Sequence, residues 1–327
     1  MPKKKRTPTV PSTARPQRPR HRRERTRQAL VLGLGGLAIA VIFGLTVLAL
    51  YLSRQGLGGT TALEVGDTSF TTGYLLRRLR LLVDEGQPLD PFLVANMIAQ
   101  EETVRQQAGT LDVFITPEEV DEEIADQLGV SLGDGEAFAA AYQQELERTG
   151  LSEEEFRQMV EARVLERKVR FSLTEQVPPT ADQAFLRLIL VPTQADAQTV
   201  LERLEAGEEF ADLAQELSLD SISRDTRGEL GWTARGLFGD DFDEAVFALD
   251  AGQRSGPITT DQGVYIVEVD EKASDRELTP EQRSALGDRA FADWLTERSA
   301  SVGVFILLDQ EKFNWVLQRA LPQGGGG

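Results

Sequence analysis

The chain has 327 residues, enough for about two domains with extensions, and carries a formal net charge of −18. It contains no cysteine, which excludes disulfides, thiol nucleophiles and cysteine-ligated zinc, and its one histidine, His21, lies near the N-terminus. A Ser-His-Asp triad or a histidine metal site is therefore excluded from the rest of the chain, and with them most hydrolase mechanisms.

The charge is divided unevenly along the chain. Residues 1–28 hold eleven Lys and Arg against Glu24, whereas the remaining residues hold 24 Lys and Arg against 52 Asp and Glu. This acidic body is expected to repel nucleic acid and anionic lipid, so a contact with either would fall to the tail. The Pro- and Arg-rich tail, residues 1–28, is expected to be disordered and to determine topology, with binding to anionic headgroups as the alternative.

A transmembrane helix is predicted directly after the tail. Ala29–Leu52 contains no charged residue, and as a helix it would span roughly 36 Å, enough for a bilayer core of about 30 Å. A cleaved signal peptide is the alternative, but its apolar region is shorter, about 7–15 residues. Because the basic residues precede the span, we expect a single-pass protein of the cell membrane with a cytoplasmic N-terminus and extracytoplasmic domains. Gly36, Ala40 and Gly44 form a small-residue face that would allow a homodimer.

Residues 53–178 are predicted to form a mostly helical domain. Helix starts are marked by capping boxes, in which a hydroxyl residue is followed three positions later by Glu or Gln: Thr116 with Glu119, Ser152 with Glu155 and, further on, Thr279 with Gln282. Val177-Pro178-Pro179 ends the helical region, because proline cannot continue a helix. Residues 273–321 are expected to add helices at Ala285–Ser299 and Glu311–Leu321, before a flexible tail at 322–327.

Residues 181–272 are predicted to form a small α+β domain. Leu186–Val191 is an apolar strand, and Val264–Val269 alternates towards a closing strand. Between them we expect short helices at Asp196–Glu205, Glu209–Glu216 and Phe242–Leu249, and an added strand near Leu230–Thr233. The acidic run Gly239–Glu244 lacks the spacing of a calcium loop and indicates a helix N-terminus. The predicted fold class is therefore α+β.

The order and spacing of five motifs in this domain resemble the parvulin (PpiC-type) peptidyl-prolyl isomerase domain. The motifs are Phe185–Val191, Gly228–Trp232, Phe242–Leu249, Ser255–Pro257 and Gly263–Val267. The resemblance implies an antiparallel sheet with flanking helices and an enzyme that rotates X-Pro bonds. Such a rotation must overcome a barrier of about 18–20 kcal/mol but breaks no bond, so neither a metal nor another cofactor is expected.

The resemblance also implies the site residues. The least that such a site needs is an apolar surface that binds the proline ring, because a dry pocket weakens amide resonance. We call this surface the seat. By resemblance, it is formed by Leu230, Phe238 and Phe242. Asp220 stands where the family carries aspartate or cysteine, and Thr260 where a hydroxyl often lies beside the second histidine.

Two positions depart from the family pattern. The family usually has a histidine in its first strand and another in its last, and here these positions read Leu188 and Tyr265. We therefore predict Asp220, Tyr265 and Thr260 as catalytic residues, and Leu188 as a substrate-binding residue beside the seat. Without the two imidazoles, isomerase activity is expected to be weak or lost.

The helical region resembles the SurA/PrsA/PpiD chaperone-foldases. The matching segments are Leu63–Tyr74, Ile115–Ile124 and Gly150–Arg157. In that family the helices form a cradle for unfolded chains, completed by a helix after the isomerase domain, here within 273–321. The combined prediction is a membrane-anchored extracytoplasmic isomerase and chaperone that acts on unfolded or newly exported polypeptides with X-Pro bonds. A non-catalytic holdase with a degenerate isomerase domain is the alternative, and a lipid or nucleic-acid binder working through the tail is a third hypothesis.

Overall fold

The computed structural model describes residues 56–84, 90–260 and 262–320. The basic tail, the predicted span Ala29–Leu52 with Gly36, Ala40 and Gly44, and residues 322–327 lie outside this part. Among the described residues, no helix is both long enough and apolar enough to cross a bilayer. Residues 1–59 and 60–327 form two separate units, and of the first only the short 3-10 helix η1 (Gly56–Gly59) is described.

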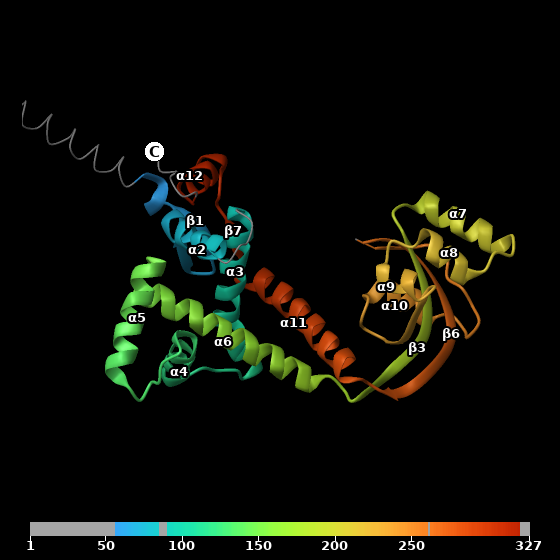
Figure 1. Ribbon diagram of the computed structural model, residues 1–327, viewed down its shortest axis with the longest axis horizontal. Helices are drawn as coiled ribbons and strands as arrows, with labels where there is room; N and C mark the ends of the chain where they lie inside the picture. Colours follow the sequence, from blue (N-terminus) through green and yellow to red (C-terminus); the bar gives the residue numbers. More distant parts are fainter. Residues whose placement is uncertain (1–55, 85–89, 261, 321–327) are drawn as a thin grey trace, which may run out of the picture. The chain divides into compact units, whose positions relative to one another are not determined.

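The first part of the second unit is mostly helical (Figure 1). A small antiparallel sheet combines the two ends of this unit, because β7 from near the C-terminus pairs with β1 in the order β2-β1-β7. The C-terminal segment therefore returns to the first helices. The elements are β1 (Thr61–Val65), β2 (Thr68–Thr71), α2 (Thr72–Asp84), α3 (Pro91–Gln107), η2 (Ala108–Leu111), α4 (Pro117–Leu128), α5 (Gly135–Thr149), α6 (Glu153–Gln176), α11 (Pro280–Val302), β7 (Val304–Ile306) and α12 (Gln310–Ala320).

The three helix starts predicted from capping boxes and the stop after residue 176 are confirmed, whereas α11 (Pro280–Val302) extends beyond the predicted Ala285–Ser299 at both ends. Thr116, Ser152 and Thr279 each cap a helix, and in each case the Glu or Gln three residues later bonds back to the N-cap amide. α6 ends at Gln176, immediately before the Val-Pro-Pro segment. Local sequence chemistry therefore decides where these helices begin and end.

A buried ion pair ties α2 to α3 inside the helical core. Arg78 is almost fully buried, and its guanidinium donates two hydrogen bonds of 2.7 Å to the carboxylate of Glu101 and one of 2.8 Å to the hydroxyl of Tyr74. Such forked pairing offsets part of the cost of removing both charges from water. The charge is thus tolerated beside the apolar residues Leu75, Leu79 and Ile98.

The second part of the unit is a four-stranded antiparallel sheet in the order β4-β3-β6-β5, with helices on both faces. α7 and α8 cover one face and α10 covers the other. The mixed α+β fold and the antiparallel sheet of the prediction are confirmed. The elements are β3 (Thr180–Val191), α7 (Gln194–Glu205), α8 (Phe210–Leu217), α9 (Ser221–Asp225), β4 (Glu229–Ala234), α10 (Asp240–Phe247), β5 (Ile258–Thr260) and β6 (Gly263–Glu277).

The two central strands are longer than the sequence pattern indicates. β3 begins six residues before Leu186, and β6 continues to Glu277, because the polar ends of the two strands pair with each other from Thr180↔Glu277 onward. α9 and β5 were not expected. The acidic run does open α10, with Asp240, Asp241 and Asp243 in its first turn, as predicted.

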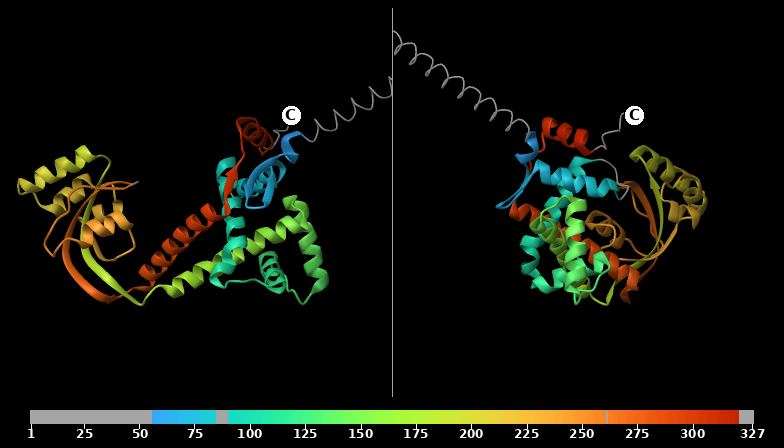
Figure 2. Two further views of the ribbon diagram at one scale, coloured as in Figure 1. Left: turned by 180° about the vertical axis from the view of Figure 1, so that it is seen from behind. Right: turned by 60° about the vertical axis from the view of Figure 1, so that its left-hand side comes forward.

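α6 and α11 pack closely at a glycine, and both helices can be followed in the two views of Figure 2. A Cβ added at Gly287 of α11 would clash with Thr174 Oγ1 on α6 and lie 2.8 Å from Thr174 Cβ and 3.0 Å from its Cα. Since the nearest atoms belong to the start of a side chain and to backbone, they cannot swing away. The helices would have to separate.

Gly287→Ala is therefore expected to lower the free energy of unfolding by about 1–3 kcal/mol, the usual cost of overpacking a core. Gly135→Ala is the matched control, because Gly135 begins α5 and an added Cβ there meets nothing within 4 Å. Urea unfolding of the full chain, followed by circular dichroism, measures both. An unchanged midpoint for Gly287→Ala would contradict the close packing.

Candidate active site

The two positions at which the family pattern has histidine lie on the same face of the sheet. Leu188 of β3 pairs with Val267 of β6, and Leu190 pairs with Tyr265, so Leu188 and Tyr265 are diagonal neighbours across the two strands. Diagonal side chains on one face are typically about 7–8 Å apart, within reach of long side chains. Leu188 and Tyr265 are 1% and 4% exposed and belong to one apolar cluster with Phe242.

Three aromatic rings make up one side of this cluster. Phe238 stacks on Phe242 with 4.6 Å between ring centroids, and Tyr265 meets both rings edge-on at 6.3 and 5.8 Å. Phe242 is 1% exposed, whereas Phe238 and Leu230 are only partly buried against the cluster. Of the predicted seat, Phe242 is therefore enclosed by its neighbours, and Phe238 and Leu230 are the members that solvent reaches.

The hydroxyl of Tyr265 has a partner in the turn between β5 and β6. It donates a 2.7 Å hydrogen bond to Oε1 of Gln262. The backbone amide of Gln262 in turn donates to Oγ1 of Thr260 at 3.2 Å, and that hydroxyl donates to the carbonyl of Gly263 at 3.1 Å. Tyr265 and Thr260 are thus linked through Gln262, which the sequence analysis did not single out. The only feature of the sequence that could have indicated Gln262 is its position three residues before Tyr265.

Asp220 is the N-cap of α9. Its Oδ1 accepts a 2.6 Å hydrogen bond from the amide of Ser223, which is one of the capping contacts that the sequence allows. The preceding residues follow the edge of β3, because Leu190 exchanges hydrogen bonds with Ser218 Oγ and the Leu219 amide. Asp220 therefore lies in a loop beside Leu190, which belongs to the apolar cluster.

A buried carboxylate, Asp243, was missed by the sequence analysis. Its Oδ2 accepts a 2.6 Å hydrogen bond from the amide of Gly236 and so fixes residues 235–239, the segment between β4 and α10 that carries Phe238. Burial raises the pKa of Asp243 above its ordinary 3.8, while the Gly236 amide and the charges of Arg235 and Arg289 lower it. In the sequence this residue was indistinguishable from the other acids of the run 239–244.

The site offers apolar walls and a few hydrogen-bonding groups. Across the ranges that the structure describes, no group of three or more acidic or histidine side chains is placed to hold a metal ion. The arrangement can bind an apolar group against Leu230 and Phe238 and offers hydrogen-bonding oxygens nearby.

Comparison with known families identifies both parts of the chain. Residues 190–271 match the PPIC-type PPIASE domain, and residues 22–170 match the SurA-like N-terminal domain. The chain carries a PPIC-type isomerase domain behind a SurA-like N-terminal domain. This confirms the resemblance on which the prediction rests, and the cluster around Leu188 and Tyr265 lies mostly inside the PPIC-type match.

Curated relatives share the two parts to different extents. The foldase protein PrsA of Oceanobacillus iheyensis is 28% identical over 183 residues, which are 52% of this chain and 60% of that protein. Foldase protein PrsA 3 of Bacillus anthracis is 33% identical, over 41% of this chain and 48% of that protein. The chaperone SurA of Methylobacillus flagellatus is 33% identical, over 37% and 31%. The chain thus spans less than two thirds of each relative, and their activities are properties of those proteins.

Solved structures are similar to this chain as well. A peptidylprolyl isomerase (PrsA) from Bacillus anthracis is 20% identical, with 70% of this chain and 95% of that chain covered and a TM-score of 0.41. NmPin, the parvulin of Nitrosopumilus maritimus, is 35% identical, with 28% of this chain and 98% of that chain covered and a TM-score of 0.26.

The role of Asp243 is testable by two substitutions. Asp243→Ala leaves the partly buried amide of Gly236 without its acceptor, so the free energy of unfolding at pH 7 should fall by about 1–3 kcal/mol. Asp243→Asn keeps an acceptor and removes the buried charge, so its cost should be smaller than that of Asp243→Ala.

The pH dependence has a definite sign. Because the pKa is raised on folding, the folded state holds the proton more tightly than the unfolded state, and the stability that this provides is lost as the pH rises above about 3.8. The stability of the wild type relative to Asp243→Asn should therefore fall between pH 4 and pH 7, as denaturant titrations at several pH values will measure. A difference that does not change with pH would contradict the burial of this charge.

Proposed function

We propose that this chain is a membrane-anchored, extracytoplasmic peptidyl-prolyl isomerase and chaperone that assists the folding of exported polypeptides. The observation that carries the proposal is the pair Leu230 and Phe238, which lie inside the PPIC-type match and are partly exposed beside the buried Leu188, Phe242 and Tyr265. Two partly exposed apolar side chains on an apolar floor suit the ring of a proline. The whole domain assignment, with boundaries at 53–178, 181–272 and 273–321, belongs to the same proposal.

The mechanism needs only this surface. A planar X-Pro amide is more polar than its twisted form, since resonance separates charge across the bond. A proline held against Phe238 and Leu230 loses part of its water shell, which favours the twisted form relative to the planar one. In this proposal the oxygens of Asp220, Thr260 and Tyr265 would hydrogen-bond backbone groups of the substrate. Uncatalysed isomerisation takes tens to hundreds of seconds, so a modest acceleration already matters for folding.

The anchor and the partners follow from the sequence. Ala29–Leu52 would hold the protein in the cell membrane with residues 1–28 in the cytoplasm. Gly36, Ala40 and Gly44 would pair two copies within the bilayer. The clients would be unfolded or newly exported chains that contain X-Pro bonds.

A non-catalytic holdase is the second candidate function, and one observation favours it. Leu188 and Phe242 are enclosed by neighbouring side chains, and no imidazole can join them, because the only histidine is His21. Aggregation suppression by the wild-type chain without any X-Pro turnover would decide for the holdase.

The apolar surface is tested by Phe238→Ala and Leu230→Ala in the full chain, purified in detergent. Each variant should lower kcat/KM on an X-Pro peptide by about tenfold, which corresponds to about 1.4 kcal/mol of lost contact. A protease-free assay measures the rate. Leu201→Ala is the control, because Leu201 is also partly buried but packs on the opposite face of the sheet. Wild-type rates in Phe238→Ala would remove this surface from the mechanism.

The two replaced histidine positions are tested by restoring them. Leu188→His and Tyr265→His together should raise kcat/KM, because two imidazoles on diagonal positions can hydrogen-bond each other. Leu188→His alone should lower the melting temperature, since it buries a polar group without a designed partner. A double variant that folds normally and is no faster than the wild type would show that these positions do not limit the rate.

A further inference from the structure

The segment that carries Phe238 is held on one side by its own domain. We call residues 235–239 the Phe238 loop. Besides the bond from Gly236 to Asp243, the amide of Arg235 donates to the carbonyl of Asp182 at 2.9 Å, and the Arg235 guanidinium lies 4.2 Å from the ring centroid of Phe247. Phe238 itself stacks on Phe242. These contacts fix the start of the loop and the ring of Phe238.

The other side of the loop faces α11, at two glycines. Gly236 and Gly239 have φ angles of +100° and +108°, a region that favours glycine, so the loop approaches α11 through bare backbone. Leu286 Cδ2 lies 2.9 Å from the place that a Cβ on Gly236 would take. The Arg289 guanidinium lies 3.4–3.9 Å from the corresponding place on Gly239, and its Nη2 is 3.7 Å from Oδ1 of Asp240. The loop therefore contacts α11 on one side and α10 on the other.

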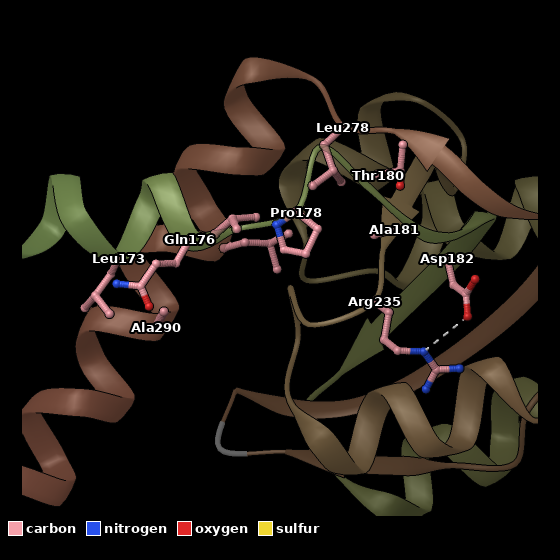
Figure 3. Close-up of a pocket in the computed structure, with 11 residues that line it drawn as sticks. Leu173, Gln176, Pro178, Thr180, Ala181, Asp182, Arg235, Leu278 and Ala290 are labelled. Atoms are coloured by element: carbon pink, nitrogen blue, oxygen red, sulfur yellow. Dashed lines mark ion pairs between the residues drawn. The ribbon is translucent and has the colours of Figure 1, made fainter. Parts of the chain in front are cut away.

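α11 packs along most of its length on the helical part, and its first turn also bonds the isomerase sheet through Gln282 and the carbonyl of Trp232. Gly287 packs on Thr174 of α6, and Phe291 and Trp294 join Val169 and Leu173 in one apolar cluster. Next to Leu286, a hollow of about 450 Å³ separates α11 and the end of α6 from the first residues of β3 (Figure 3). Arg235 and Asp182 face each other across 4.0 Å at the isomerase side of this hollow. Beside the hollow, Leu286 and Arg289 bridge from α11 to the loop.

We infer that Leu286 and Arg289 are positioning residues of the isomerase site, which keep the Phe238 loop closed on α10 and thereby set the affinity for the substrate. The inference rests on the proposed isomerase function and extends it by a residue set outside the PPIC-type match. Because most of α11 packs on the helical part, these two residues connect the helical part to the Phe238 loop.

The first test is kinetic and uses the full chain in detergent with an X-Pro peptide. Leu286→Ala and Arg289→Gln should each raise KM about 3–10-fold while kcat stays within about twofold, because neither residue touches the reacting bond. Partial unfolding would have the opposite signature, a lower apparent kcat at unchanged KM. The conservative variants Leu286→Met and Arg289→Lys should restore the wild-type KM.

The controls lie on the same helix. Leu295→Ala removes the same number of atoms as Leu286→Ala, but from a residue that packs in the α6–α11 cluster. Arg283→Gln is the control for Arg289→Gln, because the guanidinium of Arg283 pairs with Glu175 of α6. Within the described residues, Leu295 packs on α6 and Arg283 bonds Glu175, so both variants should leave KM unchanged. A KM that rises equally in the controls, or that does not rise in Leu286→Ala and Arg289→Gln, overturns the inference.

The second test does not depend on turnover. Hydrogen exchange of the peptide that covers residues 234–241, measured by mass spectrometry on the full chain, should accelerate at least threefold in Leu286→Ala, because the Gly236 amide loses its cover. Peptides from β3 and β6 should exchange at the wild-type rate. Unchanged exchange in the loop overturns the inference. If exchange in the loop accelerates but the wild type has no X-Pro turnover, Leu286 does hold the loop in place and the proposed isomerase function is wrong.

Discussion

The antiparallel pairing of β3 with β6 is the interaction on which the isomerase part depends. The register runs from Thr180↔Glu277 to Val191↔Val264, almost the full length of both strands. At one end it brings Leu188 and Tyr265 onto one face. At the other end it draws together the two points where the chain enters from α6 and leaves towards α11, since the amide of Leu278 donates to the carbonyl of Pro179 at 2.9 Å. One ladder therefore positions both the candidate site and the link to the helical part.

The same strands also explain why the candidate site is apolar. Residues 188–191 are buried on both faces, with Leu188 and Leu190 towards α10, and Ile189 and Val191 towards α7 and α8. A histidine at 188 would need a partner in this surrounding, and Tyr265 instead turns its hydroxyl out to Gln262. The site is therefore packed with apolar side chains and contains no imidazole. A response to pH between 6 and 7 cannot arise from a histidine here.

Local chemistry made part of this structure predictable. Capping boxes, the Val-Pro-Pro stop and the apolar strand runs each depend on residues close in sequence, and the corresponding helices and strands were found where expected. The polar start of β3 was missed because Thr180 and Ala181 gain their strand conformation from β6, about a hundred residues away. The predicted substrate-binding residues and Tyr265 share one apolar cluster, and their roles stay predictions. The bond from Gly236 to Asp243 and the cover by Leu286 depend on tertiary contacts that no local pattern encodes.

The start of α11 shows how a local signal acquires a long-range role. Gln282 completes the capping box, because its Oε1 accepts from the amide of Thr279 at 3.0 Å. Its Nε2 is thereby directed towards the sheet, where it donates to the carbonyl of Trp232 on β4 at 2.8 Å. A glutamate at this position would cap the helix equally well but would present a second oxygen to that carbonyl. Gln and Glu would therefore serve the helix equally well. Only Gln282 can also donate to β4, and this bond fixes the first turn of α11 against the strand that leads into the Phe238 loop.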